Sequence, residues 1–550
     1  MSDAYVLGIS GGIRSGHHDA AAVLYHGGKL VAGGEEERFL RIKHAEGRLP
    51  ENAIRFCLAR AGITLKEVKT VAYGYATVPG MQARLRDYLE LKFGHSPAIR
   101  LVPHYLAHAA SAYRVSGFED AMILSADVSG DSVSTLLSRG QGERITALKT
   151  IARPNSLGLF YSMLTQILGF QRDNDEYKVM GLASYGRNEV DLSWLLRHEA
   201  GDYRLNHEEY LVSVGQSQAF PSKQEGIYTE RLVKRLGRPR LKEEPLTQAH
   251  MDLAYSAQKT LERAVVDLVT WLHRETGSRN LCIAGGVGLN CVMNQRLLAL
   301  PFVDRIYVQP AASDAGTAVG AALEVLAERG VAPERMDHVY LGPSFSNEEI
   351  ARTLDSFKVP YRREEDVCRF GAEKIAQGAI LGWFQGAMEF GPRALGNRSI
   401  LADPRDPGMK DRINATIKFR EDFRPFAPAV LEEKVEEYFV GGVSSPFMTL
   451  TFDVQEEQKE RIASITHIDG TARIQTVSAA TNPRFHRLIS EVGRVTGIPM
   501  VINTSFNVKG QPIVTTPRDA ISTFYMTGMD HLILGDYVLS KEATPLPAAR

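Results

Sequence analysis

One pattern occurs twice in the chain and limits the folds that it can adopt. Residues 5–9 are an apolar segment that runs into a polar, glycine-containing turn, and residues 20–39 then resemble two strands joined by a glycine turn. Residues 121–127 begin the same succession, with the two strand-like segments at residues 132–151. Short apolar runs bounded by turn residues are typical of buried strands, and a recurring pattern indicates a repeated unit. The sequence therefore predicts an α/β domain made of two similar halves that face each other across a cleft.

A pair of histidines lies between the two occurrences of this pattern. His104 and His108 are four positions apart in a segment that we interpret as a helix, so both side chains lie on one face. Asp127 ends a predicted buried strand, and Asp314 follows another strand-like segment. Open α/β sheets place ligands at the carboxyl ends of strands. Two imidazoles and two carboxylates suit iron, zinc or manganese, so we expect a metal site; ordinary hydrogen-bonded helix histidines are the alternative.

A glycine turn gives a second candidate site in the same part of the chain. Residues 281–290 are a strand-like segment that enters the turn, and residues 291–298 follow as a predicted helix. A strand, a glycine turn and a helix N-terminus together form an anion site, because the backbone N–H groups can approach a phosphate. A tight turn without a ligand is the alternative.

The long amphipathic segment of residues 250–276 is predicted to be a helix that packs in the core.

The length and composition of the chain limit its class. A chain of 550 residues exceeds one hydrophobic core and predicts two or more domains. Its net charge of −1 disfavours a nucleic-acid partner, and it has no apolar run of the about 20 residues that span a membrane. We see no signal peptide, and the four cysteines form no CxxC pair, which favours reduced thiols in a cytoplasmic protein. The acidic triplet of residues 35–37 is expected at a solvated hairpin edge.

A second polar region follows a domain boundary that we place in residues 331–346, which are rich in turn formers. Residues 386–428 interleave basic and acidic side chains, which is also the composition of a self-neutralised surface. Arg393 lies between a Gly-Pro pair and a glycine, and Arg424 precedes a proline, so their backbones are restrained. Restrained arginines suit phosphate recognition. We therefore predict an anion site, in which Asn503, at the end of a buried strand, is placed to bind a small amide or a ribose.

Ordered motifs along the chain resemble those of a known family. They are HDAA, EEERF and KH in the first part, then HYLAHAASAY, KVMGLA, AGGVGLN and ASDAG, and finally GPRALGNRS, RPFAP and NTSFN. In this order they resemble the NodU/CmcH-type O-carbamoyltransferases over nearly the whole chain. The resemblance implies an α/β fold with an actin-like (ASKHA, TsaD/Kae-like) duplicated domain at residues 1–340. It also implies a YrdC-like α/β domain at residues 345–550.

The resemblance also implies an activity and a set of site residues. Members of this family make carbamoyl-adenylate from carbamoyl phosphate and ATP with Mg²⁺, and they then pass the carbamoyl group to a hydroxyl at one divalent metal, typically Fe²⁺. His18, beside Asp19, corresponds to the general base, although the neighbouring His17 leaves that assignment open by one residue. The remaining implied residues are His104, His108, Asp127 and Asp314 for the metal; Lys43, Gly285, Gly286, Gly288 and Asn290 for the adenylate; and Arg393, Arg398, Lys418, Arg424 and Asn503 for carbamoyl phosphate and ATP.

The expected partners are carbamoyl phosphate, ATP and a hydroxylated small molecule such as a sugar or a natural product, without nucleic acid or membrane. The identity of the acceptor, the identity of the metal and the oligomeric state, including a homodimer, stay open. Three alternatives also stay open. They are an enzyme of tRNA threonylcarbamoylation, an actin-like small-molecule kinase, and a non-enzymatic nucleotide sensor stabilised by a metal.

Overall fold

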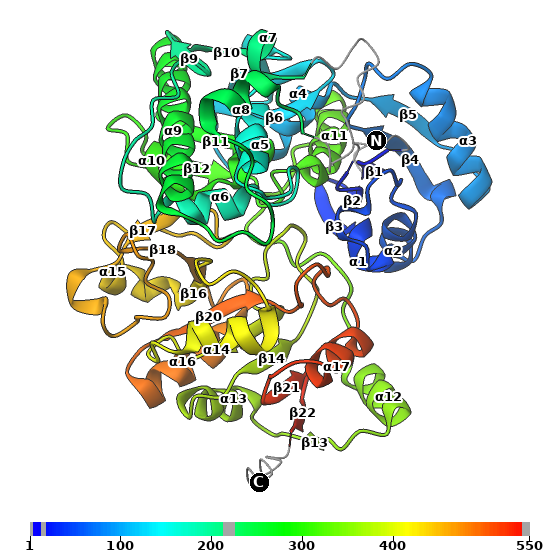
Figure 1. Cartoon of the computed structure of the whole chain (residues 1–550). Coiled ribbons are helices and arrows are strands. Elements are labelled where there is room, and N and C mark those ends of the chain that lie inside the picture. Colours follow the sequence, from blue (N-terminus) through cyan, green and yellow to red (C-terminus); the bar gives the residue numbers. More distant parts are fainter. Residues whose placement is uncertain (1–3, 13–17, 213–225, 542–550) are drawn as a thin grey trace. The chain divides into compact units, whose positions relative to one another are not determined.

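The computed structural model describes residues 4–12, 18–212 and 226–541, which form two compact units (Figure 1). The first unit takes its described residues from Met1–Val339 and adds Phe390–Pro392 and Thr449–Thr451; the second takes its described residues from Tyr340–Glu389, Arg393–Met448 and Phe452–Arg550. His17 lies outside the described residues. The predicted division of labour between residues 1–340 and 345–550 stays a prediction.

The first half of unit 1 is built on a mixed five-stranded sheet with the order β3-β2-β1-β4-β5. Strands β1, β2 and β3 form an antiparallel meander, while β4 and β5 run parallel to β1. Gly27 and Gly28, which join β2 to β3, both have positive φ (54° and 83°), as a tight hairpin turn requires. The strands are β1 (Tyr5–Ile9), β2 (Ala21–His26), β3 (Lys29–Glu35), β4 (Val68–Tyr73) and β5 (Ala98–Leu101).

The second half of unit 1 repeats this arrangement. Its five-stranded sheet has the order β12-β11-β6-β7-β8, with an antiparallel meander of β6, β7 and β8 and with β11 and β12 parallel to β6. Counted from the meander, both sheets therefore have the same strand order and directions, which confirms the predicted duplication. The strands are β6 (Asp120–Gly130), β7 (Val133–Gln141), β8 (Arg144–Ala152), β11 (Asn280–Ala284) and β12 (Arg305–Val308).

Two helices, α4 (His104–Tyr113) and α11 (Asp314–Glu328), pack against each other, and α11 also packs on β1 and β4. Glycines make these contacts close. A β-carbon on Gly320 of α11 would overlap the carbonyl of Ala107 in α4, and one on Gly8 of β1 would overlap the carbonyl of Ala318 in α11. The backbones can approach to this distance only because these positions lack a side chain.

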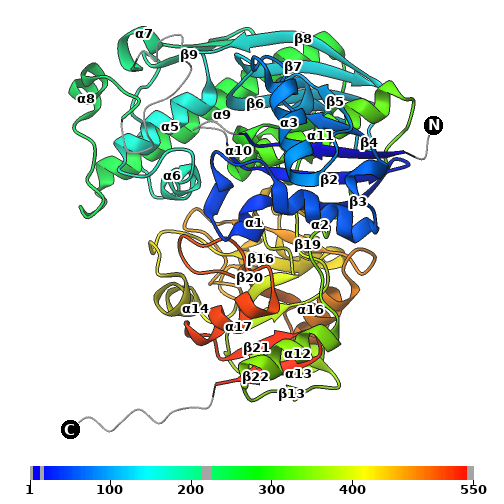
Figure 2. The ribbon, with the colours of Figure 1, turned by 90° about the vertical axis from the view of Figure 1, so that its right-hand side faces the viewer.

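Further helices of unit 1 pack on the two sheets. Helix α2 packs on β2 and β3 (Figure 2), and α9 buries the apolar stripe predicted for it, including Leu253, Leu261 and Leu268. The remaining elements of this unit are α1 (Glu36–Leu40), α2 (Glu51–Ala61), α3 (Met81–Phe93), α5 (Leu157–Ile167), α6 (Glu176–Ala183), β9 (Leu196–Glu199), β10 (Asp202–Leu205), α7 (His207–Tyr210), α8 (Glu230–Leu236), α9 (Gln248–Thr276) and α10 (Cys291–Leu298).

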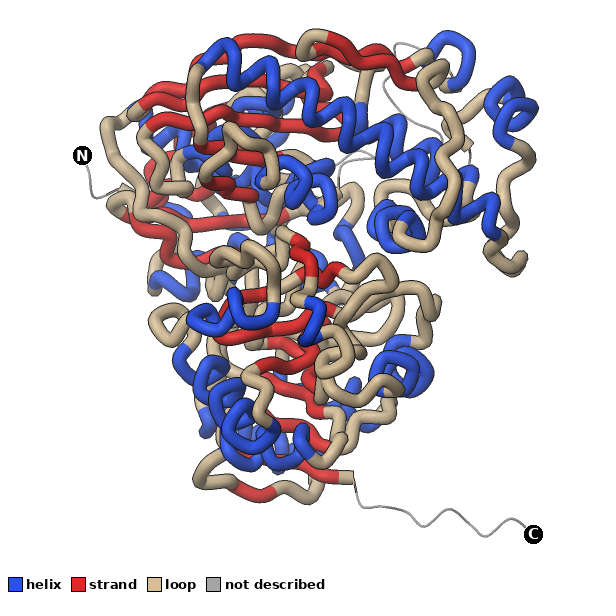
Figure 3. The backbone as a smooth tube through the Cα atoms, turned by 90° about the vertical axis from the view of Figure 1, so that its left-hand side faces the viewer, coloured by secondary structure: helices blue, strands red, loops and turns tan. Residues whose placement is uncertain are grey.

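Unit 2 is organised around an eight-stranded mixed sheet, whose strands are drawn in red in Figure 3. Its order is β13-β22-β21-β14-β15-β20-β16-β19, and α13 and α16 pack together on its core. The strands are β13 (Arg362–Arg363), β14 (Leu381–Phe384), β15 (Arg398–Ala402), β16 (Ala427–Leu431), β19 (Gln475–Val477), β20 (Met500–Ser505), β21 (His531–Leu534) and β22 (Tyr537–Ser540). The helices are α12 (Asn347–Phe357), α13 (Val367–Ala376), α14 (Met409–Ile413), α15 (Val435–Tyr438), α16 (Pro483–Thr496) and α17 (Pro517–Tyr525), and β17 (Thr451–Asp453) pairs with β18 (Thr471–Arg473).

One strand of this unit differs from the sequence interpretation. The sequence suggests a single last strand at residues 532–539, whereas the structure has two antiparallel strands, β21 and β22. Gly535 turns the chain between them with a φ of 56°, which the hydrophobic pattern alone does not reveal.

Among the described residues, none of the helices combines the length and the hydropathy of a membrane span.

Candidate active site

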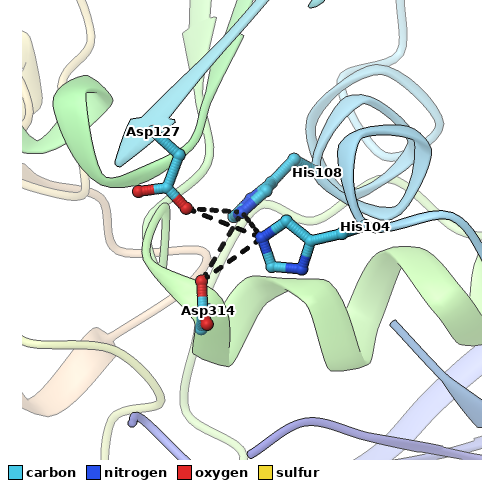
Figure 4. Close-up of side chains that lie close together, drawn as sticks. All are labelled: His104, His108, Asp127 and Asp314. Carbon is cyan, nitrogen blue, oxygen red and sulfur yellow. Dashed lines mark hydrogen bonds and ion pairs between the residues drawn. The ribbon is translucent and has the colours of Figure 1, made fainter. Parts of the chain in front are cut away.

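Four side chains of unit 1 converge on one point (Figure 4). His104 and His108 project from the first turns of α4, Asp127 from β6, and Asp314 from the first turn of α11. One ligand atom from each residue lies within 4.8 Å of the other three. His104, His108 and Asp314 are almost completely buried. The structure therefore brings together all four residues that the sequence predicts to share a metal.

The spacing of these atoms fits one first-row metal ion. The Nε2 atom of His108 lies 3.0 Å from Nε2 of His104, 3.2 Å from the Asp127 carboxylate and 3.7 Å from the Asp314 carboxylate. Nε2 of His104 lies 3.6 Å and 3.5 Å from the same two carboxylates. Ligands bound at 2.0–2.2 Å to a tetrahedral ion lie about 3.3–3.6 Å from one another. The donor set of two imidazoles and two carboxylates suits iron, zinc or manganese.

Surrounding groups fix the orientation of these four side chains. The Nδ1 atom of His104 lies 2.9 Å from the carbonyl of Gly74, so a hydrogen on Nδ1 leaves Nε2 free to bind a metal. The hydroxyl of Tyr75 donates to Asp314 at 2.8 Å. Gly130 lies against the His104 ring, and a β-carbon there would overlap the imidazole. The cluster is therefore held in place by contacts of the kind that support metal ligands in proteins.

The charges of the cluster favour a cation at its centre. Burial alone would lower the pKa of His108, but hydrogen bonds and charge interactions with Asp127 and Asp314 raise it to about 9. Burial would raise the pKa of Asp127, but His104 and His108 hold that pKa well below its usual value. The carboxylates thus stay ionised and stabilise positive charge on the imidazole of His108, and a metal ion would supply that charge in its place.

The sequence predicts that Asp127 and Asp314 both follow the end of a strand, and the structure places only Asp127 there. Asp127 lies where the regular pairing of β6 with β7 is interrupted, between Ala126 and Gly130, so it ends the paired part of its strand as expected. Asp314 does not lie at a strand end. It is the first residue of α11, after the loop that follows β12.

The predicted base and its neighbour form a second group of side chains. Nδ1 of His18 lies 3.1 Å from the carboxylate of Asp19, and Nδ1 of His44 lies 2.8 Å from the other oxygen of that carboxylate. Burial would lower the pKa of His18, but Asp19 and, more weakly, Asp314 and Asp173 raise it to about 10. Without a metal this ring is therefore protonated at neutral pH. A cation held by Asp314 would oppose that shift, so the role of His18 as a base stays a prediction.

The acidic triplet beside this group is not solvated, and the expectation of an exposed hairpin edge is wrong. Glu35, Glu36 and Glu37 are 8%, 1% and 5% exposed. Glu36 accepts hydrogen bonds from the backbone N–H groups at the start of α2, which covers this edge. Arg38 pairs with Glu35 and Glu37, each at 2.9 Å. The triplet is part of a buried charge network.

The residues predicted to hold an adenylate fall into two places. Lys43 pairs with Glu37 at 3.4 Å, close to His44. Gly285 and Gly286 lie against the end of β6, where a β-carbon on Gly285 would overlap the carbonyl of Ala126 and one on Gly286 would lie 3.0 Å from Asp127. Gly288 continues this turn, and the side chain of Asn290 caps α10 and pairs with Gln258. The glycine turn therefore adjoins the metal cluster, and its adenylate role stays a prediction.

In unit 2, Arg398 has a structural setting. Its guanidinium is fully buried and donates to the carbonyls of Gln385 (2.6 Å), Gly386 and Pro343, and it lies 3.6 Å from the centre of the Phe384 ring. Burial lowers its pKa to about 9, against the attraction of Glu389. These carbonyl contacts occupy both terminal nitrogens, so the geometry favours a role in folding for Arg398 over a role in phosphate binding, and the predicted role stays untested.

The surroundings of Lys418 and Asn503 suit ligand binding better than those of Arg398. Lys418 is 4% exposed, and its ammonium group contacts oxygens of Ser505 and Asn507 at the end of β20. Burial, together with the charges of Arg420 and Arg424, holds the pKa of Lys418 well below its usual value, so a bound anion would relieve the repulsion there. Asn503 is 1% exposed, donates to Gln475 at 2.7 Å, and leaves its own Oδ1 buried without a hydrogen bond.

The loop that carries Arg393 is held by a residue that the sequence interpretation missed, Glu389. One carboxylate oxygen of Glu389 accepts from the backbone N–H groups of Leu395 (2.7 Å), Asn397 (2.8 Å) and Arg398 (3.2 Å). The carboxylate thus folds the Arg393–Arg398 loop, and the carbonyl of Ala394 in that loop accepts from Asn503. Arg424 pairs with Glu421 at 3.6 Å. The glycines of GPRALGNRS are the only sequence signal for such a turn, and they do not point to Glu389.

Comparisons with known proteins identify the family. A family model described as Carbamoyltransferase N-terminus matches residues 9–83 and 72–323, and one described as Carbamoyltransferase C-terminus matches residues 372–541. The chain belongs to the carbamoyltransferase family. The resemblance that its motifs suggest is therefore confirmed, and the chain is a carbamoyltransferase.

Relatives of this carbamoyltransferase include two nodulation proteins. Nodulation protein NolNO of Sinorhizobium fredii is 40% identical, with 97% of this chain and 82% of the relative covered. Nodulation protein NolO of Bradyrhizobium diazoefficiens is 42% identical, with 80% of this chain and 79% of the relative covered. Among solved structures, component A of the (R)-2-hydroxyglutaryl-CoA dehydratase of Acidaminococcus fermentans aligns with a TM-score of 0.35 at 14% identity, over 58% of this chain and 97% of that one.

Proposed function

We propose that this carbamoyltransferase is an ATP-dependent O-carbamoyltransferase. In this proposal it forms carbamoyl-adenylate from carbamoyl phosphate and ATP, and then transfers the carbamoyl group to a hydroxyl of a small molecule. The observation that carries the proposal is the buried cluster of His104, His108, Asp127 and Asp314, which meets the spacing of one metal ion in a chain whose family transfers carbamoyl groups. The proposal includes an actin-like duplicated unit 1 that performs transfer and a YrdC-like unit 2 that forms the adenylate.

The transfer step requires a base and an activated carbonyl. The acceptor oxygen forms a bond to the carbamoyl carbon, the bond from that carbon to the oxygen of AMP breaks, and AMP leaves with the bonding electrons. His18 takes the hydroxyl proton, and Asp19 holds the ring of His18 in place. A divalent metal held by the four-residue cluster would polarise the carbonyl or the acceptor hydroxyl. His104, His108 and Asp314 are buried, and a transfer site beside them would limit the access of water to the reactive mixed anhydride.

The adenylation step requires cations that bind phosphate groups. For balance, carbamoyl phosphate, ATP and one water give carbamoyl-adenylate, pyrophosphate and phosphate, with Mg²⁺ accompanying ATP. Lys418, Arg424 and Arg393 are proposed to bind the phosphate groups, because the repulsion between Lys418 and its cationic neighbours is relieved by an anion. The buried Oδ1 of Asn503, which lacks a hydrogen bond, is suited to accept from the carbamoyl NH₂ group.

Pyrophosphate release tests this proposal. Wild-type protein supplied with ATP, Mg²⁺ and carbamoyl phosphate is expected to release pyrophosphate, and Arg393→Ala is expected to abolish that release while the protein stays folded. Arg369→Ala is the control, because Arg369 is an exposed residue that pairs with Glu373 on α13. Retained release by Arg393→Ala with an unchanged KM would overturn the role of Arg393. Formation of ADP with a phosphorylated acceptor would instead indicate a kinase, and it would overturn the function.

A further inference from the structure

We propose that His44, anchored by Asn174, is a positioning residue that holds Asp19 against His18 and so aligns the base for carbamoyl transfer. The inference rests on the proposed function, because it assumes that His18 acts on the acceptor hydroxyl. It adds to that function two residues and a loop that neither the motifs nor the comparisons assign.

The first observation is that two imidazoles share one carboxylate. The Oδ2 atom of Asp19 faces Nδ1 of His18 at 3.1 Å, and its Oδ1 atom faces Nδ1 of His44 at 2.8 Å. The shorter contact is the one made by His44. Because a carboxylate is planar, fixing one oxygen also fixes the direction in which the other oxygen meets His18. His44 therefore fixes the orientation of Asp19, and with it the position of the carboxylate oxygen that lies beside the His18 ring.

The second observation settles which way the His44 ring faces. The side-chain amide of Asn174 donates from Nδ2 to Asp175 at 2.7 Å, so the carbonyl oxygen of Asn174 is the atom that faces His44. That oxygen lies 2.9 Å from Nε2 of His44. Both ring nitrogens of His44 thus face oxygen atoms, one from Asp19 and one from Asn174. Rotation of the ring would break one hydrogen bond at each end.

The third observation is that the backbone ties the same residues together. The N–H group of Asp19 donates to the carbonyl of His44 at 2.8 Å, and the N–H group of His44 donates to Glu37 at 2.7 Å. Asp19 and His44 both have positive φ, 55° and 62°. Non-glycine residues in this region occur where surrounding contacts hold them, often at functional sites. The side-chain contact is therefore reinforced by the main chain.

The fourth observation extends the chain of contacts to a loop. The N–H groups of Asp173 and Asn174 donate to the half-buried carboxylate of Glu176, at 2.8 Å and 3.0 Å, so the loop that presents Asn174 is itself fixed. The negative charge of Asp173 also helps to raise the pKa of His18. The loop before α6 thus reaches the transfer site through Asn174 and His44, and its effect on the reaction is one of alignment.

Two isosteric substitutions of His44 separate alignment from general stability. The amide NH₂ of asparagine replaces the Nδ1 position of histidine, so His44→Asn keeps a donor for Asp19. Glutamine places its NH₂ near the Nε2 position, so His44→Gln keeps the contact with Asn174 and loses the one with Asp19. His198→Gln is the matched control, because His198 lies beside Asp267 on another part of unit 1, 3.7 Å from its carboxylate.

The experiment measures both half-reactions of the full chain, with pyrophosphate release reporting adenylate formation and mass spectrometry reporting transfer. We expect His44→Gln, which loses the contact with Asp19, to lower the kcat of transfer by roughly 10- to 100-fold, with the acceptor KM and the pyrophosphate release within about twofold of wild type. We expect Asn174→Ala, which loses only the contact at Nε2 of His44, to stay within about fivefold of wild type. We expect His44→Asn to stay within about fivefold of wild type. The comparison of the asparagine and glutamine variants decides the question, because each keeps one of the two ring contacts of His44.

Two outcomes would overturn the inference. One is a His44→Asn variant that is impaired as strongly as His44→Gln; the other is equal loss of both half-reactions in His44→Gln. The His18→Asn variant separates this failure from failure of the proposed function. If His18→Asn loses transfer and His44→Gln does not, the positioning role is wrong while the base assignment stands. If His18→Asn keeps full transfer, the base assignment itself is wrong.

Discussion

His104 and His108 direct their Nε2 atoms at each other across 3.0 Å, although both rings are buried and belong to the same helix. Two imidazole nitrogens come this close when a proton or a cation lies between them. The carboxylates of Asp127 and Asp314 lie 3.2–3.7 Å from the same two atoms, which supplies the negative charge that a cation needs. This pair of histidines is the structural basis for the metal-dependent transfer proposed for the carbamoyltransferase.

Substitution of Gly130 tests whether the position of the His104 ring matters. A β-carbon in Gly130→Ala would overlap the imidazole, which the carbonyl of Gly74 prevents from moving freely. We expect the purified variant to contain well below one metal ion per chain by elemental analysis, with wild-type protein near one. Gly408→Ala is the control, because a β-carbon there meets only Asp406 at an ordinary 3.4 Å. Full metal content in Gly130→Ala would show that the ring does not bind the metal.

Removal of the Tyr75 hydroxyl tests the group that supports Asp314. Tyr75→Phe deletes the hydrogen bond of 2.8 Å to the Asp314 carboxylate and leaves the ring in place. Loss of such a supporting contact typically weakens metal binding by about 10- to 100-fold. Competition with a chelator measures this affinity. Tyr113→Phe is the matched control, because its hydroxyl donates to two backbone carbonyls instead, and equal affinity of the two variants would contradict the assigned support.

The convergence of His104, His108 and Asp127 could be predicted from the sequence because short-range rules place these residues. Helix periodicity puts His104 and His108 on one face, and the end of an apolar strand puts Asp127 at the edge of a sheet. The helical position of Asp314 was not predictable in the same way, because the small residues around it suit a loop or a helix. The contact between His44 and Asn174 spans 130 positions, so no local pattern points to it.

Unfolding of an Arg398 variant tests whether this residue maintains the fold. Arg398→Met removes several hydrogen bonds to buried backbone carbonyls and leaves the carbonyls of Gln385 and Pro343 without that donor. We expect the free energy of unfolding in urea to fall by about 3–5 kcal/mol. The surface variant Arg369→Met is expected to change it by less than about 0.5 kcal/mol. A change that small in Arg398→Met would return Arg398 to the candidates for phosphate binding.

The partners of Arg398 also show why composition misleads in this region. The sequence interleaves acids and bases between residues 386 and 428, which suggests ion pairs at a surface. In the structure, the guanidinium of Arg398 bonds to backbone carbonyls, and the carboxylate of Glu389 bonds to backbone N–H groups. Backbone partners of this kind depend on the folded loop, so the side-chain sequence does not reveal them.

The pH dependence of stability can be predicted for Asp252 in α9. Hydrogen bonds from the backbone of Arg187, from Gln248 and from Asn188 lower its pKa from 3.8 to about 2. Because the folded-state pKa is depressed, its stabilising contribution is present above pH 3.8 and is lost as the pH falls towards 2. The difference in unfolding free energy between wild type and Asp252→Asn, measured in urea, is therefore expected to be constant at neutral pH and to shrink below about pH 4. A difference at pH 2 as large as the one at neutral pH would contradict a depressed pKa for Asp252.

Mass analysis of the acceptor tests the central claim most directly. Wild-type protein and the double variant His104→Ala/His108→Ala are incubated with ATP, Mg²⁺, carbamoyl phosphate and a panel of hydroxylated sugars and natural products. The account predicts that wild-type protein adds one carbamoyl group to an acceptor hydroxyl. It predicts that the double variant adds none and still releases pyrophosphate from ATP. Carbamoyl transfer by the double variant at the wild-type rate, or a phosphorylated acceptor in place of a carbamoylated one, would contradict it.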